Sequence, residues 1–288
     1  MRPASAKPIA ILGAGISGLV AAWALEELGI EFNIVDQGPP DALPRLARGC
    51  VYFHDRCNLP EEAVRSQVLY TSLLPAAVKD PAWAYHVKVW GLRPYVANSV
   101  ERLSMERPVV SRVWSMNDAL RFLTNRYTSN ITYWAMNRDL VLRAAADCRV
   151  VSTIPLPVLA PDARCESTPL YIFQGVGGHG RVPDDPTYGA YGHVLYNVDP
   201  DTAWYRMSSM FGYMSIEFAR KTPVWPLTVN RKIITSPDAE AFEQANPNIM
   251  LSGRWGRWSR GVLGHETYHA VKALFTTGRW ADHVRRDD

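Results

Sequence analysis

Apolar residues follow different patterns along this chain, and each pattern predicts a different kind of structure. Between Ile9 and Asp36, two short apolar runs flank an Ala- and Leu-rich stretch, which predicts a strand, a helix and a second strand. Residues 60–125 carry apolar positions at helical spacing with proline breaks, which predicts helices. We expect the last of these helices to be capped by Ser115 or Asn117.

The second half of the chain predicts a change from helix to sheet and back. Residues 138–146 predict a short helix, and residues 148–155 predict a buried strand that ends at prolines. From about 168 to 235, short aromatic and β-branched runs are separated by Gly, Pro and Asp turns, which is typical of an antiparallel sheet. After residue 248, an apolar run, a Gly-rich turn and a helical pattern follow.

The turn between the first predicted strand and helix carries a dinucleotide-binding pattern. Gly13, Gly15 and Gly18 form G-x-G-x-x-G, and Asp36 ends the second strand at the spacing of a ribose-binding carboxylate. The first glycine permits a tight turn, the second permits close approach of a pyrophosphate, and the third permits close helix–strand packing. The strand before the pattern and the helix after it make a dinucleotide site a stronger interpretation than a plain glycine-rich turn.

The order of the elements predicts an α/β fold in which insertions interrupt a Rossmann-type domain. We expect residues 1–59, 139–165 and 245–288 to form the discontinuous dinucleotide-binding domain. Residues 60–138 are expected to be a helical insertion, and residues 166–244 an antiparallel β substrate domain.

Composition narrows the function classes only slightly. The 288 residues are 47% hydrophobic, enough for a sizeable core, and the net charge of +3 is too small to indicate a partner. Arginine greatly outnumbers lysine, which suits phosphate or carboxylate recognition but also follows from a GC-rich genome. The four cysteines form no CxxC pair, so we expect reduced thiols.

The N-terminal apolar stretch resembles a signal peptide, because Arg2 and Lys7 precede it. Glycines interrupt the stretch, however, and Glu26 and Glu27 follow it without a small-residue cleavage site. No other segment approaches the roughly 20 apolar residues of a membrane span. We therefore expect a soluble, cytoplasmic protein with no membrane partner.

Three segments, in order along the chain, resemble motifs of the FAD-dependent superfamily that contains the flavin amine oxidases and UDP-galactopyranose mutase. The first is the glycine pattern with Asp36. The second, residues 146–157 (ADCRVVSTIPLP), looks like that superfamily's "aD.VIsT.P" strand, and the third, residues 248–258 (NIMLSGRWGRW), is similar to its "GR.g.w" element. In that superfamily, the helix after the third segment points its N-terminus at the flavin. The resemblance therefore implies FAD rather than NAD.

Further segments are similar to the mutase branch. Residues 49–54 (GCVYFH) resemble "GpHiFHt" beside the flavin, residues 204–207 (WYRM) resemble "pYtRi" with its substrate-facing arginine, and residues 224–226 (VWP) resemble "YPv". The chain departs from the mutase pattern at Ser208-Ser209, where an acid is usual, and the second diphosphate arginine of that family matches no single position in this chain. These departures argue against UDP-sugar binding and leave FAD binding intact.

The motifs and the resemblance together nominate the cofactor-binding residues. They are Gly13, Gly15, Ser17, Gly18, Asp36, Arg45, Arg48, Gly49, Thr153, Pro155, Gly253, Arg254, Glu266 and Thr267. Asp36 would accept hydrogen bonds from the adenosine ribose, and Arg45 or Arg48 would neutralise the pyrophosphate unless they are ordinary loop arginines. The helix start around Glu266 and Thr267 would stabilise negative charge on reduced flavin.

Three residues are candidates for catalysis, and each has a plain structural alternative. His54 would lie against the isoalloxazine ring and relay protons, or else pack as a core histidine. Arg206 would hold an anionic substrate group over the flavin, or else form an ordinary salt bridge. Trp258, with Trp255, would line the pocket, or else belong to the core.

One motif suggests a different chemistry. Residues 265–269 (HETYH) match H-E-x-x-H, in which two histidines on one helical face bind zinc and the glutamate acts as base. The only nearby third ligands are Asp282 and His283 in the charged tail, and the motif falls in the helix that the resemblance places beside FAD. We therefore expect no metal.

The sequence as a whole predicts an FAD-dependent oxidoreductase of amine-oxidase type. The flavin would accept a hydride from the carbon of a C–N bond in an amine or amino-acid-like group. Alternatives are a flavin-dependent lyase that trims an amino-acid group from a modified nucleobase in DNA, a mutase-like reaction on a nucleotide sugar, and a non-catalytic FAD-binding protein. The expected substrate is a small amine or an amino-acid-modified molecule, with a DNA-linked one left open. By family analogy, a homodimer is a further possibility.

Overall fold

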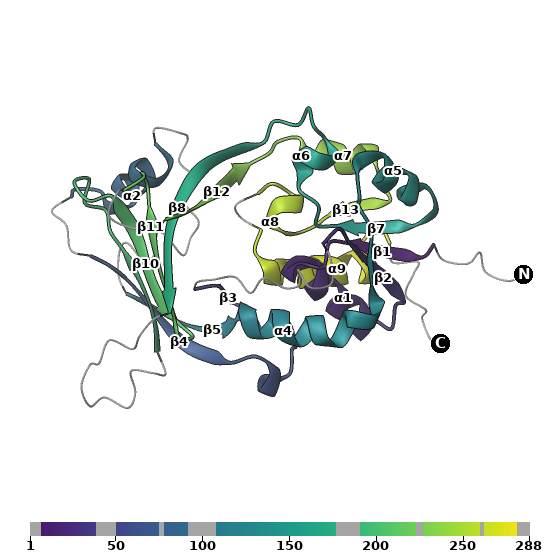
Figure 1. Ribbon diagram of the computed structural model, residues 1–288, viewed down its shortest axis with the longest axis horizontal. Helices are drawn as coiled ribbons and strands as arrows, with labels where there is room; N and C mark the ends of the chain where they lie inside the picture. Colours follow the sequence, from purple (N-terminus) through teal and green to yellow (C-terminus); the bar gives the residue numbers. More distant parts are fainter. Residues whose placement is uncertain are drawn as a thin grey trace, which may run out of the picture.

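The computed structural model describes most of the chain. The described residues are 7–38, 50–74, 78–91, 108–176, 191–222, 227–259 and 262–280. Their strands fall into two sheets, with helices packed around the first sheet and one helix beside the second (Figure 1). None of the helices in these ranges is both long and apolar enough to cross a membrane.

The first sheet is a parallel five-stranded sheet with the order β13-β7-β1-β2-β6. Its strands are β1 (Ile9–Leu12), β2 (Phe32–Asp36), β6 (Ile131–Tyr133), β7 (Arg149–Ser152) and β13 (Ile249–Leu251). Strands from both ends and the middle of the chain therefore meet in one sheet, as the Rossmann-type prediction required. The predicted α/β fold class is confirmed.

Helices cover both faces of the first sheet. One core contains α1 (Ile16–Glu27), α4 (Met116–Tyr127) and α9 (Gly264–Thr276), which bury residues such as Leu19, Leu123 and Phe275 together with β1 and β2. The opposite core contains α5 (Arg138–Asp147), α6 (Leu156–Leu159) and α7 (Ala239–Ala245), together with Trp258, which follows α8 (Gly253–Gly256). The result is the three-layer arrangement that parallel sheets need, because both faces of the sheet are apolar.

The second sheet has eight strands in the order β12-β8-β11-β10-β9-β4-β5-β3. They are β3 (Tyr52–Phe53), β4 (Ser66–Leu73), β5 (Val109–Ser115), β8 (Glu166–Val176), β9 (Tyr191–Tyr196), β10 (Trp204–Met210), β11 (Tyr213–Phe218) and β12 (Thr228–Thr235). All neighbours pair antiparallel except β4 and β9, which are parallel. A third core joins this sheet to α2 (Pro81–Trp90).

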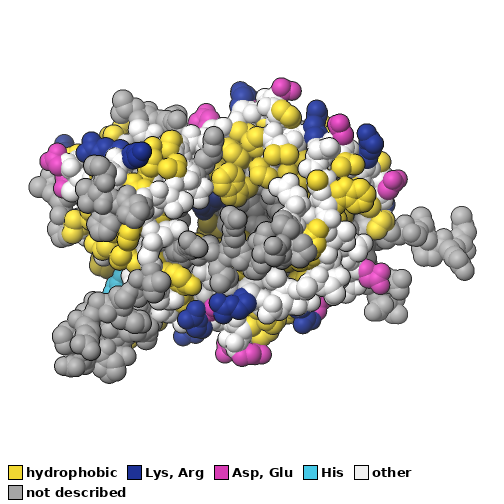
Figure 2. Space-filling model, viewed as in Figure 1, with side chains coloured by type: hydrophobic (Ala, Val, Ile, Leu, Met, Phe, Trp, Pro, Cys, Tyr) yellow, Lys and Arg dark blue, Asp and Glu magenta, His cyan; other side chains and the backbone are white. Residues whose placement is uncertain are grey.

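The long strands β8 and β12 arch from the second sheet towards α6 and α7, which pack on the first sheet (Figure 1). Short 3₁₀ turns, η2 (Glu61–Ala63) and η3 (Thr128–Asn130), precede β4 and β6. The space-filling view shows the surface hollowed between the parts of the molecule built on the two sheets (Figure 2).

The helical prediction is wrong for residues 60–74. Pro60 and the two glutamates after it resemble a helix start, but they form only the turn η2. The chain then enters β4, in which Leu69 and Thr71 are buried and Tyr70 between them is partly exposed. This period of two, with β-branched and aromatic residues, favours a strand once a neighbouring sheet is present.

The helical prediction is also wrong for β5, which pairs with β4 in the second sheet. Residues 92–107 of the predicted helical region lie outside the described residues.

The remaining predicted elements are confirmed where the structure describes them. Helix α4 begins after Ser115, whose side chain accepts a hydrogen bond from the Asp118 backbone N–H, so the cap is Ser115 rather than Asn117. Helix α5 and the antiparallel strands β8 to β12 also fall in the predicted regions. The domain boundaries at 59, 138, 165 and 244 stay a prediction, although α4 and β6 lie with the first sheet rather than in an insertion.

Gly18 tests the close packing of α1 on β1. A Cβ at this position would lie 1.8 Å from the Gly13 carbonyl oxygen. Gly18→Ala should therefore destabilise the cofactor-free protein by about 1–3 kcal/mol, although alanine normally stabilises a helix interior by about 1 kcal/mol. Urea unfolding measures the difference.

Gly15→Ala is the matched control, because no described atom lies within 4 Å of a Cβ there and φ is −68°. Equal unfolding midpoints for the two variants would contradict the close approach at Gly18.

Candidate functional site

The loop after β1 and the start of α1 form a cradle for phosphates. Gly13 has φ +101°, and a Cβ there would lie 2.2 Å from Thr153 Oγ1, so the position requires glycine. Gly15 borders open space in the described part of the molecule. It is also the N-cap of α1, where no described side chain caps the helix and the first turn holds no acidic residue. The first N–H groups of α1 thus face open space at the positive end of the helix dipole, as a pyrophosphate requires.

Asp36 ends β2 beside this cradle. Its Oδ2 accepts a hydrogen bond from the Ala14 backbone N–H at 2.6 Å, and its Oδ1 accepts one from the Gly38 N–H at 2.7 Å. Each carboxylate oxygen has a second lone pair, so both can still accept a hydrogen bond from a ribose hydroxyl. The backbone bonds hold the carboxylate at the edge of the sheet, where the ribose of a dinucleotide lies in this type of fold.

The predicted cofactor residues of the three sequence motifs meet around this cradle. A Cβ on Gly253 would lie 2.5 Å from Ser17 Oγ, so the start of α8 touches the first turn of α1. Thr153 Oγ1 donates to the Leu12 carbonyl at 2.9 Å, which fixes the end of β7 against β1. Segments more than 200 residues apart in sequence therefore close on one another at the carboxyl edge of the sheet.

The remaining nominated cofactor residues divide into two groups. Pro155 precedes α6, and Arg254 is exposed on α8. Arg45, Arg48 and Gly49 lie outside the described residues. Their roles stay predictions.

The N-terminus of α9 is fixed by its own first turn. The Glu266 carboxylate accepts a hydrogen bond from the Leu263 backbone N–H at 2.6 Å, which caps the helix. Thr267 is buried, and its hydroxyl lies 3.1 Å from Ser252 Oγ at the end of β13. Glu266 therefore acts here as a capping residue, and Thr267 connects α9 to the parallel sheet.

Two histidines meet at this helix start. The rings of His54 and His265 are 6.0 Å apart between centroids and cross at 74°. Burial lowers the pKa of both side chains, although the nearby Glu266 carboxylate opposes the shift, and the lowered pKa favours the neutral imidazoles. His265 Nδ1 is buried and has no hydrogen-bond partner in the described part of the chain. A neutral histidine pair of this kind can accept a proton from a bound molecule.

The two histidines and the glutamate of the H-E-x-x-H motif in α9 make separate contacts. His269 Nε2 pairs with Asp55 Oδ2 at 2.7 Å, while His265 faces His54 and Glu266 caps the helix. Within the described ranges, no group of three or more His, Cys, Asp or Glu side chains is placed to hold a metal ion.

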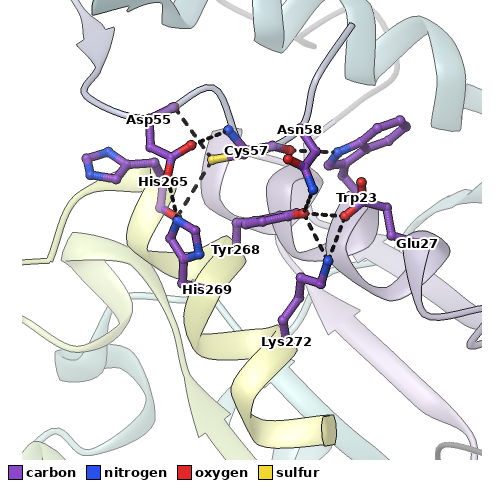
Figure 3. A network of polar contacts seen from close by, with 9 residues as sticks. All are labelled: Trp23, Glu27, Asp55, Cys57, Asn58, His265, Tyr268, His269 and Lys272. Carbon is purple, nitrogen blue, oxygen red and sulfur yellow. Dashed lines mark hydrogen bonds and ion pairs between the residues drawn. The ribbon is translucent and has the colours of Figure 1, made fainter.

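A polar network joins α9 to α1 and to the segment after β3 (Figure 3). The Tyr268 hydroxyl donates to the Glu27 carboxylate and accepts a hydrogen bond from Asn58 Nδ2 at 2.7 Å. Lys272 Nζ lies 3.1 Å from the same Glu27 carboxylate. The network fixes α9, and with it the helix start that carries His265, against the first helix of the cradle.

The second sheet contains a buried charged group, the Glu217 cluster, formed by Arg206, Glu217, Lys232, Tyr205 and Trp90. The side chain of Glu217 is 7% exposed and pairs with Arg206. The Tyr205 hydroxyl donates to the other Glu217 oxygen at 2.6 Å, and Lys232 Nζ lies 3.9 Å from that oxygen. The ammonium also lies 4.7 Å from the ring centres of Trp90 and Tyr205. One carboxylate thus faces two cations, and the cluster keeps a net positive charge.

The Glu217 cluster faces the segment that leads to the histidine pair. Glu217 and Ser215 share one face of β11, and the Cys50 backbone N–H donates to Ser215 Oγ at 3.0 Å. Tyr52, two residues on, has its ring centre 5.2 Å from that of His54. The predicted substrate arginine and the predicted proton-relay histidine therefore border the same segment.

Trp258 is placed for packing. It is 5% exposed in the core that contains α5, α6 and α7, and its indole N–H donates to the Glu166 carbonyl at 3.0 Å. Its neighbour Trp255 is more exposed and lies 5.5 Å away between ring centres. Of the two, Trp255 is better placed to contact a bound molecule, and a catalytic role for Trp258 stays a prediction without support from its position.

Sequence reasoning missed the partners of Arg206. Phe211 and Gly212 both have positive φ and join β10 to β11 as a two-residue turn. Reading the hairpin register outward from this turn places Glu217 opposite Arg206. Gly212 was a local sequence indication of this turn, and hence of the pairing between Arg206 and Glu217. Lys232 reaches the cluster from β12, and no local sequence pattern predicts its contact with Glu217.

The Glu217 cluster predicts a stability effect that depends on pH. Burial favours the neutral acid, but Arg206 and Lys232 hold the pKa of Glu217 below its usual value. A lowered carboxyl pKa stabilises the fold above the pKa of the unfolded chain, and this stabilisation is lost as the pH falls through the folded pKa. Glu217→Gln should therefore cost about 3–5 kcal/mol of unfolding free energy near pH 7 and much less in acid.

Urea unfolding at both pH values measures this difference, with exposed Glu62→Gln as the control. A Glu217→Gln penalty that stays constant with pH would show that its charge does not stabilise the fold.

Comparisons with known proteins identify the type of fold. The sequence profile of the NAD(P)-binding Rossmann-like domain family matches residues 11–40. No curated protein matches the chain in sequence. The crystal structure of reduced UDP-galactopyranose mutase is similar with a TM-score of 0.56 and 14% identity, over 97% of this chain and 98% of that chain.

A tryptophan 6-halogenase (SttH) from Streptomyces toxytricini is similar with a TM-score of 0.53 and 12% identity, over 98% of this chain and 76% of that chain. At these identities the similarity establishes the fold. The chain therefore has the type of fold seen in UDP-galactopyranose mutase and in this halogenase, which is the type of fold that its sequence motifs predicted.

Proposed function

We propose that this protein is an FAD-dependent oxidoreductase. The observation that carries the proposal is the cradle, in which the uncapped start of α1 faces open space beside Gly15 and Asp36 is held at the end of β2. Open space at this position has no packing function, but it fits a pyrophosphate that the helix N–H groups would bind.

The order of the strands orients the cofactor. Asp36 on β2 would bind the adenosine ribose, and α1 after β1 would bind the pyrophosphate. The flavin would then extend to the other side of β1, towards β7, β13 and the start of α9. His54 and His265 are at that helix start, and the Glu217 cluster faces the segment leading to it.

Bound FAD supplies a hydride acceptor, which the side chains of this protein do not. The protein would position the substrate carbon next to the flavin and exclude side reactions. The net positive charge of the Glu217 cluster would attract an anionic substrate group, and Arg206 still has donors beyond its bond to Glu217. Neutral His54 and His265 would accept protons released during the reaction.

These features favour the oxidation of a C–N bond in an amine that also carries an anionic group, such as an amino acid. Bound FAD would supply the acceptor for the hydride from the substrate carbon, and His54 or His265 would accept the proton from the nitrogen. Water would hydrolyse the resulting imine, and O₂ would reoxidise the flavin and be reduced to hydrogen peroxide. Purified protein mixed anaerobically with candidate substrates tests the reaction through loss of the oxidised flavin absorbance. Bleaching by amino acids supports the proposal. Bleaching only by an aminoacylated DNA oligonucleotide, or UDP-galactopyranose turnover by the pre-reduced protein, would replace C–N oxidation with lyase or mutase chemistry.

Gly15→Val tests the cofactor site independently of the substrate. An isopropyl group at this position would occupy the space assigned to the pyrophosphate, and no described atom within 4 Å of its Cβ would oppose it in the cofactor-free protein. We expect FAD to bind at least about 10-fold more weakly, a loss of about 1.4 kcal/mol. Titration calorimetry measures the affinity, and urea unfolding of the cofactor-free variant monitors the fold.

Gly175→Ala on β8 is the control, because its Cβ would meet only Phe173 at ordinary contact distance. Wild-type affinity for FAD in the Gly15→Val protein would place the cofactor elsewhere.

A further inference from the structure

An exposed tryptophan stands at one end of the proposed cofactor site. Trp134 follows directly after β6 and is 65% exposed. Its backbone N–H donates to the Asp36 carbonyl at 2.8 Å, so the residue is fixed next to the ribose-binding carboxylate. An indole exposed to this degree does not gain the free energy of burial in the protein alone. Its position at the proposed cofactor site explains the exposure, because a bound cofactor would cover the indole.

The strand order assigns a ligand to this position. Along the carboxyl edge of the sheet, β1 leads to the phosphate cradle, β2 ends at Asp36, and β6 is the next and last strand. The corresponding order along FAD is pyrophosphate, ribose and adenine. In this order, the adenine of a bound FAD would lie at the end of β6, at Trp134.

The direction of the neighbouring residue agrees with this assignment. Tyr133 pairs with Asp36 in register and packs against the core that contains α1 and α4. Successive side chains of an extended chain point to opposite sides, so Trp134 points away from that core. The other exposed tryptophans in the described ranges are Trp83 on α2 and Trp255 on α8, and neither belongs to a segment that pairs with β2.

We propose that the Trp134 indole is the stacking surface for the adenine ring of FAD. The inference rests on the proposed function, since it takes FAD as the ligand. An aromatic side chain stacks on a nucleobase through its π face, and the interaction does not require buried polar partners. Trp134 would then add affinity for the adenosine half of the cofactor and none for the flavin half.

The test compares Trp134→Ala and Trp134→Phe with the wild type in titrations with FAD, ADP and FMN. The loss of a base–aromatic stack corresponds to roughly a 5- to 150-fold weaker affinity. We expect Trp134→Ala to weaken FAD and ADP by such a factor and to leave FMN unchanged, while Trp134→Phe keeps most of the affinity. Quenching of tryptophan fluorescence by ADP should disappear in both variants.

Trp83→Ala is the matched control, since Trp83 is also an exposed tryptophan and stacks on His86 within α2. It should bind FAD and ADP like the wild type. Unchanged FAD and ADP affinity in Trp134→Ala, with FAD bound normally by the wild type, would overturn the stacking role alone. A wild-type protein that binds neither FAD nor ADP would overturn the proposed function as well.

Discussion

The close approach of three backbone segments at the carboxyl edge of the parallel sheet is the constraint on which the rest of the structure depends. Gly18 lets α1 approach the Gly13 carbonyl, and Gly13 leaves room for the Thr153 side chain at the end of β7. Any side chain at either glycine would separate these segments. Because they stay together, the start of α1 lies open beside Asp36, and the site can receive a pyrophosphate without further rearrangement of the backbone.

The second sheet holds a charged carboxylate inside a core. Glu217 is almost fully buried, and a buried carboxylate is costly unless cations and hydrogen-bond donors surround it. Arg206 and the Tyr205 hydroxyl on β10 and Lys232 on β12 supply these partners. The two cations exceed the one anion, so the arrangement both tolerates burial and leaves a positive charge near the segment that leads to His54.

The two halves of the molecule meet through the segment after residue 50 and the helix α9. The Cys50 backbone is bound to β11, whereas Asp55 and Asn58, a few residues later, are bound to α9. The polar network around Tyr268 then connects α9 to α1 of the cradle. One continuous set of contacts therefore relates the position of the Glu217 cluster to that of the phosphate cradle, and the distance between a substrate and a cofactor would depend on it.

The sequence by itself determined the features that depend on local geometry. The glycine spacing, Asp36 and the capped helix after Ser115 are short-range requirements of backbone conformation and hydrogen bonding, so their residue types identify them. The motif resemblance also predicted the type of fold, because the segments around Thr153 and Gly253 contact the glycine loop itself. Local sequence patterns did not predict the strand at residues 66–73, since this strand pairs with residues 191–196, far along the chain.

Only the tertiary structure decided which distant side chains act together. Lys232 joins Glu217, and Trp134 joins Asp36, through strand order rather than through sequence spacing. The H-E-x-x-H pattern had the local form of a zinc site, but Asp55 pairs with one histidine and the helix start uses the glutamate. The physical reason is the same in each case. Turns, caps and the glycine loop are set by neighbouring residues, whereas strand pairing, burial, charge pairing and exposure depend on what the completed fold brings into contact.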